Sequence, residues 1–435
     1  MLFSDITIID ENLNVRHNMY VGVKDKKIAF VGDSKPYEDF GDIYDGTGRL
    51  LMSAFFNCHA HTPMTLLRGY GENLNLQDWL HTRIFPFEAQ LDNEAVYWGT
   101  LLGLAESIRF GIVSTTDMYN FCDVIAKAFT ESGVKGNIGR AILCFTDENL
   151  REMDRFHECE DLFKAYHNTS NGRIKIDMSL HAEYTSTPKI VRQLAEYTKE
   201  IGTRMHVHVS ETKFEHEECK KRHGKTPAAY LSELGLFDSP TTAAHCVHLE
   251  DDDFTIFKEK GVTVASCPIS NLKLASGTCN VPLLMKNGIN TAIGTDSVAS
   301  NNSLNFIEEM KFFSLLHKGI FNEPAASSPR DTLYAATRAG ALSQGREDCG
   351  LLKEGFAADL IVIDISKPNM NPAHDLVNNV VYSACGGDIV LTVSDGEILY
   401  KDGEYMTIDI EKTVFEANKA TCKILSKLTR EGTES

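Results

Sequence analysis

The sequence is poor in basic residues for its length. It has 43 Lys and Arg against 61 Asp and Glu in 435 residues, which gives a formal charge of −18 at pH 7. Nucleic acids and anionic membrane surfaces are bound through clustered Lys and Arg. We therefore expect neither a nucleic acid nor a membrane as a partner.

Long apolar runs and paired cysteines are also missing. No stretch reaches the roughly 20 apolar residues that cross a bilayer, and the first residues lack the basic and apolar segments of a secretory signal. The 11 cysteines are scattered and contain no CxxC pair. We therefore expect reduced thiols in a cytoplasmic protein. The HxE…PCxxC signature of cytidine-type zinc deaminases is also absent, which excludes their fold. A homo-oligomer stays open.

The middle of the chain alternates between strand-like and helix-like runs. The eight strand-like runs are Leu50–Cys58, Ile112–Met118, Gly139–Phe145, Lys175–His181, Thr203–Val209, Thr241–Cys246, Val262–Cys267 and Thr291–Gly294. Helical patterns between them include Asn93–Phe110, Pro188–Gly202 and Leu304–Leu316. Such alternation over about 250 residues predicts an α/β fold of the (β/α)₈ TIM-barrel type. An open doubly wound sheet is disfavoured, because no Gly-rich phosphate loop follows the first strand.

Both ends of the chain consist of short β-prone runs separated by Asn, Asp and Gly. Chain termini often lie close together, so the two ends can form one sheet. We therefore predict a small β-sandwich-like domain from residues 1–53 and 353–435, and a catalytic barrel from residues 54–352. A helix is expected near the C-terminus, over Ile410–Leu428.

Two histidines separated by one residue stand at the end of the first strand-like run. Side chains alternate along a strand, so His59 and His61 point to the same face, while Cys58 points to the opposite one. Two imidazoles on one face can share a metal ion. Taken alone, such a pair is more often two incidental polar residues near a strand end.

Polar side chains at other strand ends argue that the two histidines are part of a functional site. They are His181, His208 with Glu211 three residues later, His245, and Asp296. In a (β/α)₈ barrel these ends converge on one face, where the active site is built. His206 lies two residues deeper than His208 on the same strand face, and we expect a packed histidine beneath the site.

Three imidazoles and one carboxylate form a ligand set that suits Zn²⁺, although Fe²⁺ or Mn²⁺ would accept it too. The predicted ligands are His59, His61, His208 and Asp296. A metal there would lower the pKa of a bound water towards about 7. Glu211, outside the ligand set, is placed to carry a proton. His245 is placed to orient the nucleophile or stabilise an oxyanion.

Three segments resemble the amidohydrolase superfamily. They are Asn57–Trp79 (NCHAHTPMTLLRGYGENLNLQDW), His206–Thr212 (HVHVSET) and Gly294–Leu304 (GTDSVASNNSL). Within the superfamily, the chain is most similar to the 5′-methylthioadenosine/S-adenosylhomocysteine deaminases, over nearly its whole length. Two-metal relatives often bridge their ions with a lysine from the fourth strand. Leu180–Glu183 occupies that place here, so the resemblance implies a single divalent ion.

The resemblance also implies roles for residues that contact the substrate. Glu88 would hydrogen-bond the ribose hydroxyls, which a carboxylate accepts well. His181 would contact the purine or ribose, and Trp79 would pack on the nucleoside. Arg140 and Arg151 would bind the carboxylate of a homocysteine tail, because guanidinium pairs bidentately with carboxylate.

The implied reaction is metal-dependent hydrolytic deamination of 5′-substituted adenosines. The substrates would be 5′-methylthioadenosine and S-adenosylhomocysteine, with adenosine as a further candidate, and the products an inosine derivative and ammonia. Glu211 would bind the substrate and protonate a ring nitrogen, while His245 and Asp296 steady the attacking oxygen. One alternative is hydrolysis of guanine, oxidised guanine, a pyrimidine or a triazine-like ring. An inactive scaffold is disfavoured because every expected ligand is present.

Overall fold

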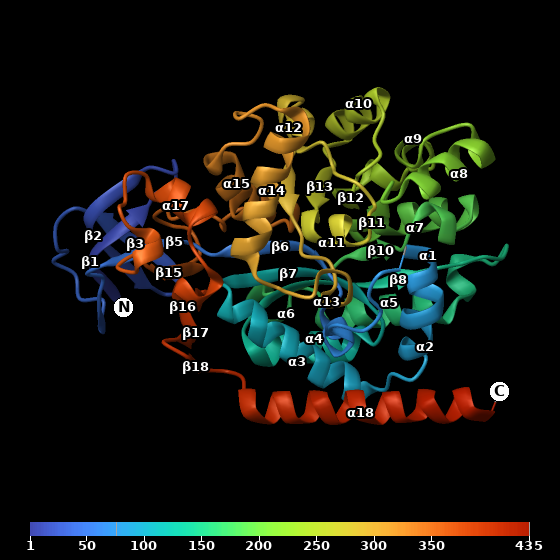
Figure 1. The fold of residues 1–435 in the computed structure, drawn as a ribbon, viewed down its shortest axis with the longest axis horizontal. Helices are drawn as coiled ribbons and strands as arrows, with labels where there is room; N and C mark the ends of the chain where they lie inside the picture. Colours follow the sequence, from blue (N-terminus) through green and yellow to red (C-terminus); the bar gives the residue numbers. More distant parts are fainter. Residues whose placement is uncertain (75, 435) are drawn as a thin grey trace.

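A parallel barrel forms the centre of the molecule (Figure 1). The structure, a computed structural model, describes residues 1–74 and 76–434. The barrel strands are β6 (Phe55–Ala60), β7 (Ile112–Tyr119), β8 (Lys135–Ile142), β9 (Ile174–Ile176), β10 (Met178–Leu180), β11 (Met205–Val209), β12 (Thr241–His245), β13 (Thr263–Ser266) and β14 (Thr291–Ile293). They pair in the order β6-β7-β8-β10-β11-β12-β13-β14, with β9 beside β8. The ring closes where the Asp296 N–H donates to the His59 carbonyl (2.9 Å). The predicted (β/α)₈ barrel is confirmed.

Helices cover the outside of the barrel, which is why its strands are buried along almost their whole length. The longer ones are α3 (Asn93–Arg109), α4 (Cys122–Ser132), α5 (Asp154–Tyr166), α7 (Pro188–Ile201), α8 (Lys213–His223), α9 (Pro227–Glu233), α10 (Asp251–Lys260), α14 (Phe306–Phe321) and α15 (Pro329–Ala336). The shorter ones are α1 (Leu76–Trp79), α2 (Phe85–Glu88), α6 (Thr169–Gly172), α11 (Pro268–Lys273), α12 (Val281–Lys286), α13 (Val298–Asn301) and α16 (Arg338–Ser343). The predicted helices α3, α7 and α14 are confirmed to within a few residues. α3 begins where the Asp92 carboxylate accepts the Ala95 N–H (2.9 Å).

Three of the predicted strands need correction. The run 175–181 forms two short strands, β9 and β10, and only β10 continues the barrel order. The run 50–58 is not one strand, because the chain changes sheets at Ala54, whose N–H donates to the Asp359 carbonyl (3.0 Å). Residues 49–53 form β5 (Arg49–Ser53) of the small sheet, and β6 starts at Phe55. The third barrel strand runs over 135–142 instead of 139–145. Its beginning contains Gly136 and Asn137, which are poor strand formers and hid it in the sequence.

The two ends of the chain form a separate sheet, as predicted. Its strands are β1 (Leu2–Ile9), β2 (Val15–Lys24), β3 (Lys27–Gly32), β4 (Ile43–Asp45), β5, β15 (Leu360–Asp364), β16 (Ile389–Ser394), β17 (Glu397–Lys401) and β18 (Glu404–Tyr405). They pair in the order β18-β17-β16-β15-β5-β1-β2-β3, with β4 beside β1. The hydrogen bonds describe one continuous sheet, where the sequence suggested a sandwich-like arrangement. The halves join where β5 pairs antiparallel with β15, Met52 opposite Ile361.

The C-terminal helices pack on helices of the barrel. α17 (Leu376–Tyr382) contacts α14 and α15, and α18 (Ile410–Glu434) lies along α3 at the edge of the molecule (Figure 1). Ala417, Ala420 and Ile424 form the buried face of α18. Lys423 Nζ pairs with Asp92 Oδ2 (2.9 Å), at the start of α3. The segment after residue 352 therefore contributes strands to the small sheet and helices that pack on the barrel.

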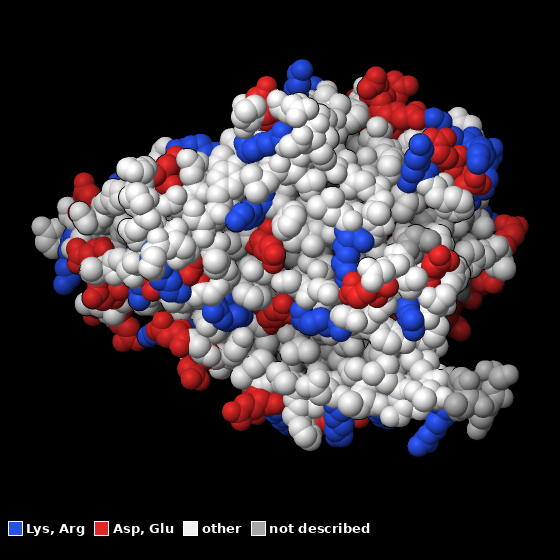
Figure 2. All heavy atoms as spheres, viewed as in Figure 1, with Lys and Arg blue, Asp and Glu red and all other residues white. Residues whose placement is uncertain are grey.

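The surface carries charges of both signs. Figure 2 shows Lys and Arg interspersed with Asp and Glu, separated by uncharged areas, over the face drawn. Among the described residues, no helix combines the length and the apolar character needed to cross a membrane. Nine of the cysteines are buried free thiols, and Cys385 and Cys422 are exposed free thiols.

Candidate functional site

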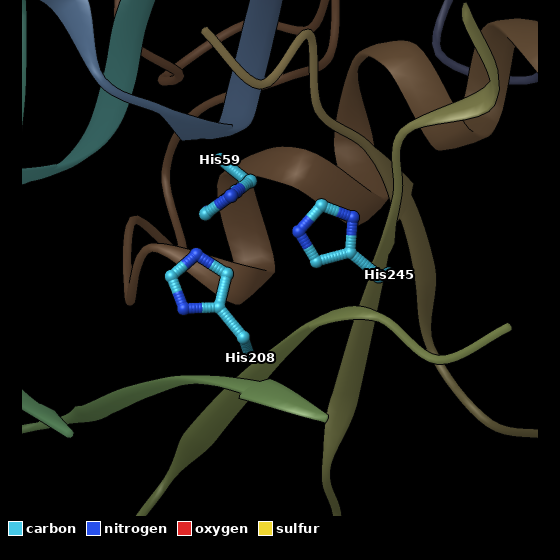
Figure 3. A group of neighbouring side chains, drawn as sticks. All are labelled: His59, His208 and His245. Carbon is cyan, nitrogen blue, oxygen red and sulfur yellow. The ribbon is translucent and has the colours of Figure 1, made fainter. Parts of the chain in front are cut away.

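The strand ends bring four histidines and one aspartate together at the C-terminal face of the barrel. His59 and His61 come from the end of β6, His208 from β11, His245 from β12, and Asp296 from the segment after β14. Figure 3 shows the rings of His59, His208 and His245 turned towards one common space. The ligand atoms of these three lie within 4.8 Å of one another, as do those of His59, His61 and Asp296. The Asp296 carboxylate is 3.6 Å from His59 Nε2 and 3.4 Å from His61 Nε2.

Hydrogen bonds from the far side of each ring orient the imidazoles. Nδ1 of His208 donates to the His181 carbonyl (2.6 Å), and Nδ1 of His61 to the Met118 carbonyl. Nδ1 of His245 lies 2.9 Å from the side-chain oxygen of Asn271. With Nδ1 engaged, Nε2 carries the lone pair, which is the arrangement of metal-binding histidines.

A buried imidazole nitrogen without a hydrogen-bond partner indicates whether the cluster fits a metal ion. Nε2 of His59 is fully buried and has no hydrogen-bond partner among the described residues, although an unpaired buried polar atom is costly. Burial lowers the pKa of His59 to about 3 and that of His208 well below its usual value, so both rings are neutral ligands. Burial favours a protonated Asp296, but the neighbouring imidazoles of His59, His245 and His61 hold its pKa well below the usual range. The donor set therefore fits a divalent cation such as Zn²⁺.

The acid next to this cluster is Glu211, in the turn after β11. Its Oε2 lies 3.9 Å from Nε2 of His245. Burial raises the pKa of Glu211, and the nearby His245 only partly offsets this. Burial lowers the pKa of His245, but the charges of Glu211 and Asp296 raise it by more. The pair suits proton transfer, because a carboxyl with a raised pKa can both accept and release a proton near neutrality.

Asp296 is held in an uncommon backbone conformation. Its φ is +59°, in the left-handed region, where non-glycine residues are uncommon and often functional. Its Oδ2 accepts the hydroxyls of Ser270 (2.5 Å) and Ser300 (3.0 Å), and its Oδ1 accepts the Ser297 N–H (2.7 Å). These donors fix the carboxylate facing the histidines.

A cavity of about 250 Å³ opens in front of the cluster. Besides the cluster, it is lined by Trp79, Glu88, Tyr119, Arg155 and His181. Glu88 comes from α2, and its Oε1 accepts the Tyr119 hydroxyl (2.6 Å). The cavity thus brings the predicted Glu88, Trp79 and His181 into one space with the histidine cluster.

The two predicted arginines lie elsewhere. Arg140 is on β8, where Ala141 faces the cavity, so strand alternation turns Arg140 out of the barrel. It pairs with Glu158 (2.5 Å) and lines a neighbouring groove of about 480 Å³. Arg151 is on the surface, 66% exposed, with Glu200 at 3.4 Å. Neither side chain lines the cavity, so their predicted contact with a substrate carboxylate stays a prediction.

Arg155 and Tyr119 are cavity residues that the sequence did not single out. Arg155 stands in the first turn of α5, and burial, together with the charge of Arg140, lowers its pKa. It has no salt bridge within 4 Å among the described residues. β8 ends at Ile142, and the segment after a barrel strand borders the active site, so a correct strand end would have indicated the start of α5 as part of the site. Tyr119 is the last residue of β7. Its position at a strand end, where barrel active sites are built, was therefore the signal that could have identified it.

The fold and the site define a metal-dependent barrel hydrolase, with a histidine–aspartate cluster at the C-terminal ends of the strands. The model of the amidohydrolase family matches residues 50–399. The chain belongs to the amidohydrolase family and is a hydrolytic enzyme.

Known proteins similar to this chain agree with that membership. A 5-methylthioadenosine/S-adenosylhomocysteine deaminase of Dictyoglomus thermophilum is 38% identical, over 98% of this chain and 99% of its own. A 5'-deoxyadenosine deaminase of Methanosarcina mazei is 39% identical over 94% of each chain. Among solved structures, a zinc-bound adenosine deaminase of Xanthomonas campestris superposes with a TM-score of 0.92, at 29% identity and 98% coverage of both chains. Atrazine chlorohydrolase of Arthrobacter aurescens has the same fold, with a TM-score of 0.90 at 21% identity, over 97% of this chain and 99% of its own.

Proposed function

We propose that the chain removes the 6-amino group of 5′-substituted adenosines by hydrolysis, yielding the inosine derivative and ammonia. The observation that carries the proposal is that one cavity is lined both by the histidine–aspartate cluster and by Glu88. The first provides hydrolytic chemistry, and the second a carboxylate for vicinal hydroxyls. The names of the relatives support a 5′-substituted adenosine over a free base.

The metal would be held by His59, His61, His208 and Asp296, and Zn²⁺ is our proposal for it. When bound, it would lower the pKa of water and so supply a nucleophile at neutral pH. The buried, unpaired Nε2 of His59 supports this ligand set.

The chain's own residues would handle the protons and the developing charge. Glu211 takes a proton from the attacking water and passes it to the purine N1 as oxygen adds to C6. His245, whose Nε2 lies 3.9 Å from Glu211 Oε2, steadies the oxygen that becomes the inosine carbonyl, together with Asp296. The proton that remains on the added oxygen is then transferred to the amino group, the C6–N bond breaks and the amino group leaves as ammonia, so that one water is consumed for each ammonia released.

The rest of the cavity would select the nucleoside. Glu88, held by Tyr119, accepts the two ribose hydroxyls. His181 contacts the purine or ribose, and Trp79, which is 5% exposed, packs on the nucleoside. Arg155 takes the place of Arg151 in the proposal, as the cavity's candidate for a carboxylate on the 5′ substituent. Asn120 lines both the cavity and the groove of Arg140, so a long substituent has a route towards that groove.

We also propose a cytoplasmic location, in keeping with the reduced cysteines. The division into residues 54–352 and the paired ends 1–53 and 353–435 is likewise kept as a proposal, and so is assembly into a homo-oligomer.

A substrate panel tests the function. Protein of measured metal content is incubated with 5′-methylthioadenosine, S-adenosylhomocysteine, 5′-deoxyadenosine, adenosine and guanine, and ammonia and the ultraviolet spectrum are followed. We expect turnover of the 5′-substituted adenosines and little of guanine. Turnover of guanine alone, or of no adenosine derivative, would overturn the proposal.

A further inference from the structure

Glu215, a buried acid in the first turn of α8, holds the backbone of the turn that carries Glu211. Its Oε1 accepts the N–H of Ser210 (3.0 Å) and its Oε2 accepts the N–H of Glu211 (2.8 Å). The residue is 4% exposed. Both oxygens of one carboxylate are therefore used on two consecutive backbone groups of the candidate active site.

The turn needs such support because its backbone is unfavourable. β11 ends at Val209 and α8 begins at Lys213, and between them Ser210 has φ +48°. Non-glycine residues seldom adopt this left-handed conformation. The next residue of the helix adds a second tie, since His216 Nδ1 lies 3.2 Å from the Ser210 hydroxyl.

Ordinary helix capping does not account for these contacts. Thr212 is the N-cap of α8, and its hydroxyl accepts the Glu215 N–H (3.2 Å). In a standard capping box, the glutamate would return the bond to the N–H of the N-cap residue itself. Here the Glu215 carboxylate reaches further back, to residues 210 and 211. It is aimed at the turn and not at the helix end.

We propose that Glu215 is a positioning residue that fixes the Glu211 side chain for proton transfer. By holding the N–H groups of the two consecutive peptides that lead into Glu211, it sets the direction in which that side chain leaves the backbone. The Glu211 carboxylate is thereby kept beside His245 and the cavity. The inference rests on the proposed role of Glu211. Displacements of about 1 Å in such groups can cost about 100-fold in rate.

The test uses the metal-loaded enzyme and Glu215→Gln. Glutamine keeps the shape but replaces one acceptor with an NH₂ group, which cannot accept an N–H. We expect kcat to fall about 10- to 100-fold, with KM for 5′-methylthioadenosine within about threefold and metal content unchanged. Glu217→Gln, at an exposed position of the same helix, is the matched control and should leave kcat unchanged. If Glu215→Gln fails to fold, Glu215→Asp is used. It keeps the charge but is too short to reach both N–H groups, and it should show the same loss.

A double-mutant cycle separates positioning from mere support of the fold. If Glu215 acts through Glu211, Glu215→Gln should cost little further in a Glu211→Gln background, measured in single turnovers with excess enzyme. Equal fold-losses in both backgrounds, or wild-type kcat in Glu215→Gln, would overturn the inference. Failure of the proposed function looks different, because wild-type enzyme would then release no ammonia from 5′-methylthioadenosine.

Discussion

Nδ1 of His59 lies 3.0 Å from Nε2 of His206, directly beneath the histidine cluster. For His59 to offer Nε2 to a metal, its Nδ1 carries the proton and donates it to His206. His206 is fully buried, and burial lowers its pKa well below the usual value, so the ring is neutral and can accept. The His59 ring is thus fixed by His206, a histidine from β11.

Replacing His206 should weaken metal binding without removing a ligand. We expect His206→Phe to lower metal affinity about 10- to 100-fold, because outer partners of ligating histidines typically contribute that much. Chelator competition measures the affinity, and His17→Gln, at an exposed site on the small sheet, is the control. Unchanged affinity would show that the His59–His206 contact does not support the metal.

Glu211→Gln should keep the metal and lose most of the activity. The amide retains the size of the side chain but cannot accept a proton, so we expect kcat to fall about 10²- to 10⁴-fold. Metal analysis and steady-state kinetics check both halves, and full activity would remove Glu211 from the mechanism.

The pH profile tests the same residue in the wild type. Burial raises the pKa of Glu211 above that of an ordinary glutamate. The group must be ionised to accept a proton, so kcat/KM should fall as the pH drops through this raised pKa. The acid limb should therefore lie at a higher pH than for a solvated glutamate. A profile flat down to the ordinary glutamate range would contradict the assignment.

Tyr119→Phe should weaken recognition of the ribose. The hydroxyl of Tyr119 donates to Glu88 (2.6 Å), and a hydrogen bond to a charged group contributes about 1.5–3 kcal/mol. We expect KM for 5′-methylthioadenosine to rise about tenfold or more, with the bound metal retained. Tyr97→Phe removes a similar Tyr–Glu bond on the surface, to Glu131 (2.6 Å), and should leave KM unchanged. Equal effects of the two variants would mean that Tyr119 does not act on the ribose.

Arg155→Gln should separate substrates by their charge. We expect KM to rise about tenfold or more for S-adenosylhomocysteine, which carries a carboxylate, and little for 5′-methylthioadenosine, which does not. Arg151→Gln is the control, since that side chain is on the surface. A selective loss with Arg151→Gln instead would restore the assignment made from the sequence.

Much of the site could be predicted because it depends on local patterns. Strand alternation put His59 and His61 on one face, and the convergence of strand ends in a barrel joined them to His208 and Asp296. His206 was expected beneath the site and lies there, 3.0 Å from His59.

The rest depends on contacts between residues far apart in the chain. β8 begins at Lys135, whose pairing with Asp359 and Asp395 stabilises a polar strand start that no local pattern reveals. The register of this strand decides that Arg140 faces outward. The exit from the same strand leads to α5, whose first turn brings Arg155 into the cavity. The split at Ala54 likewise depends on pairing with a segment 300 residues away in the sequence, around Asp359.

The most direct measurement of the central claim is the product balance with 5′-methylthioadenosine. Metal-loaded wild-type enzyme should release one ammonia for each methylthioinosine formed, and chelation should stop both until Zn²⁺ is restored. Release of adenine, or ammonia release that persists after the metal has been removed, would contradict the account.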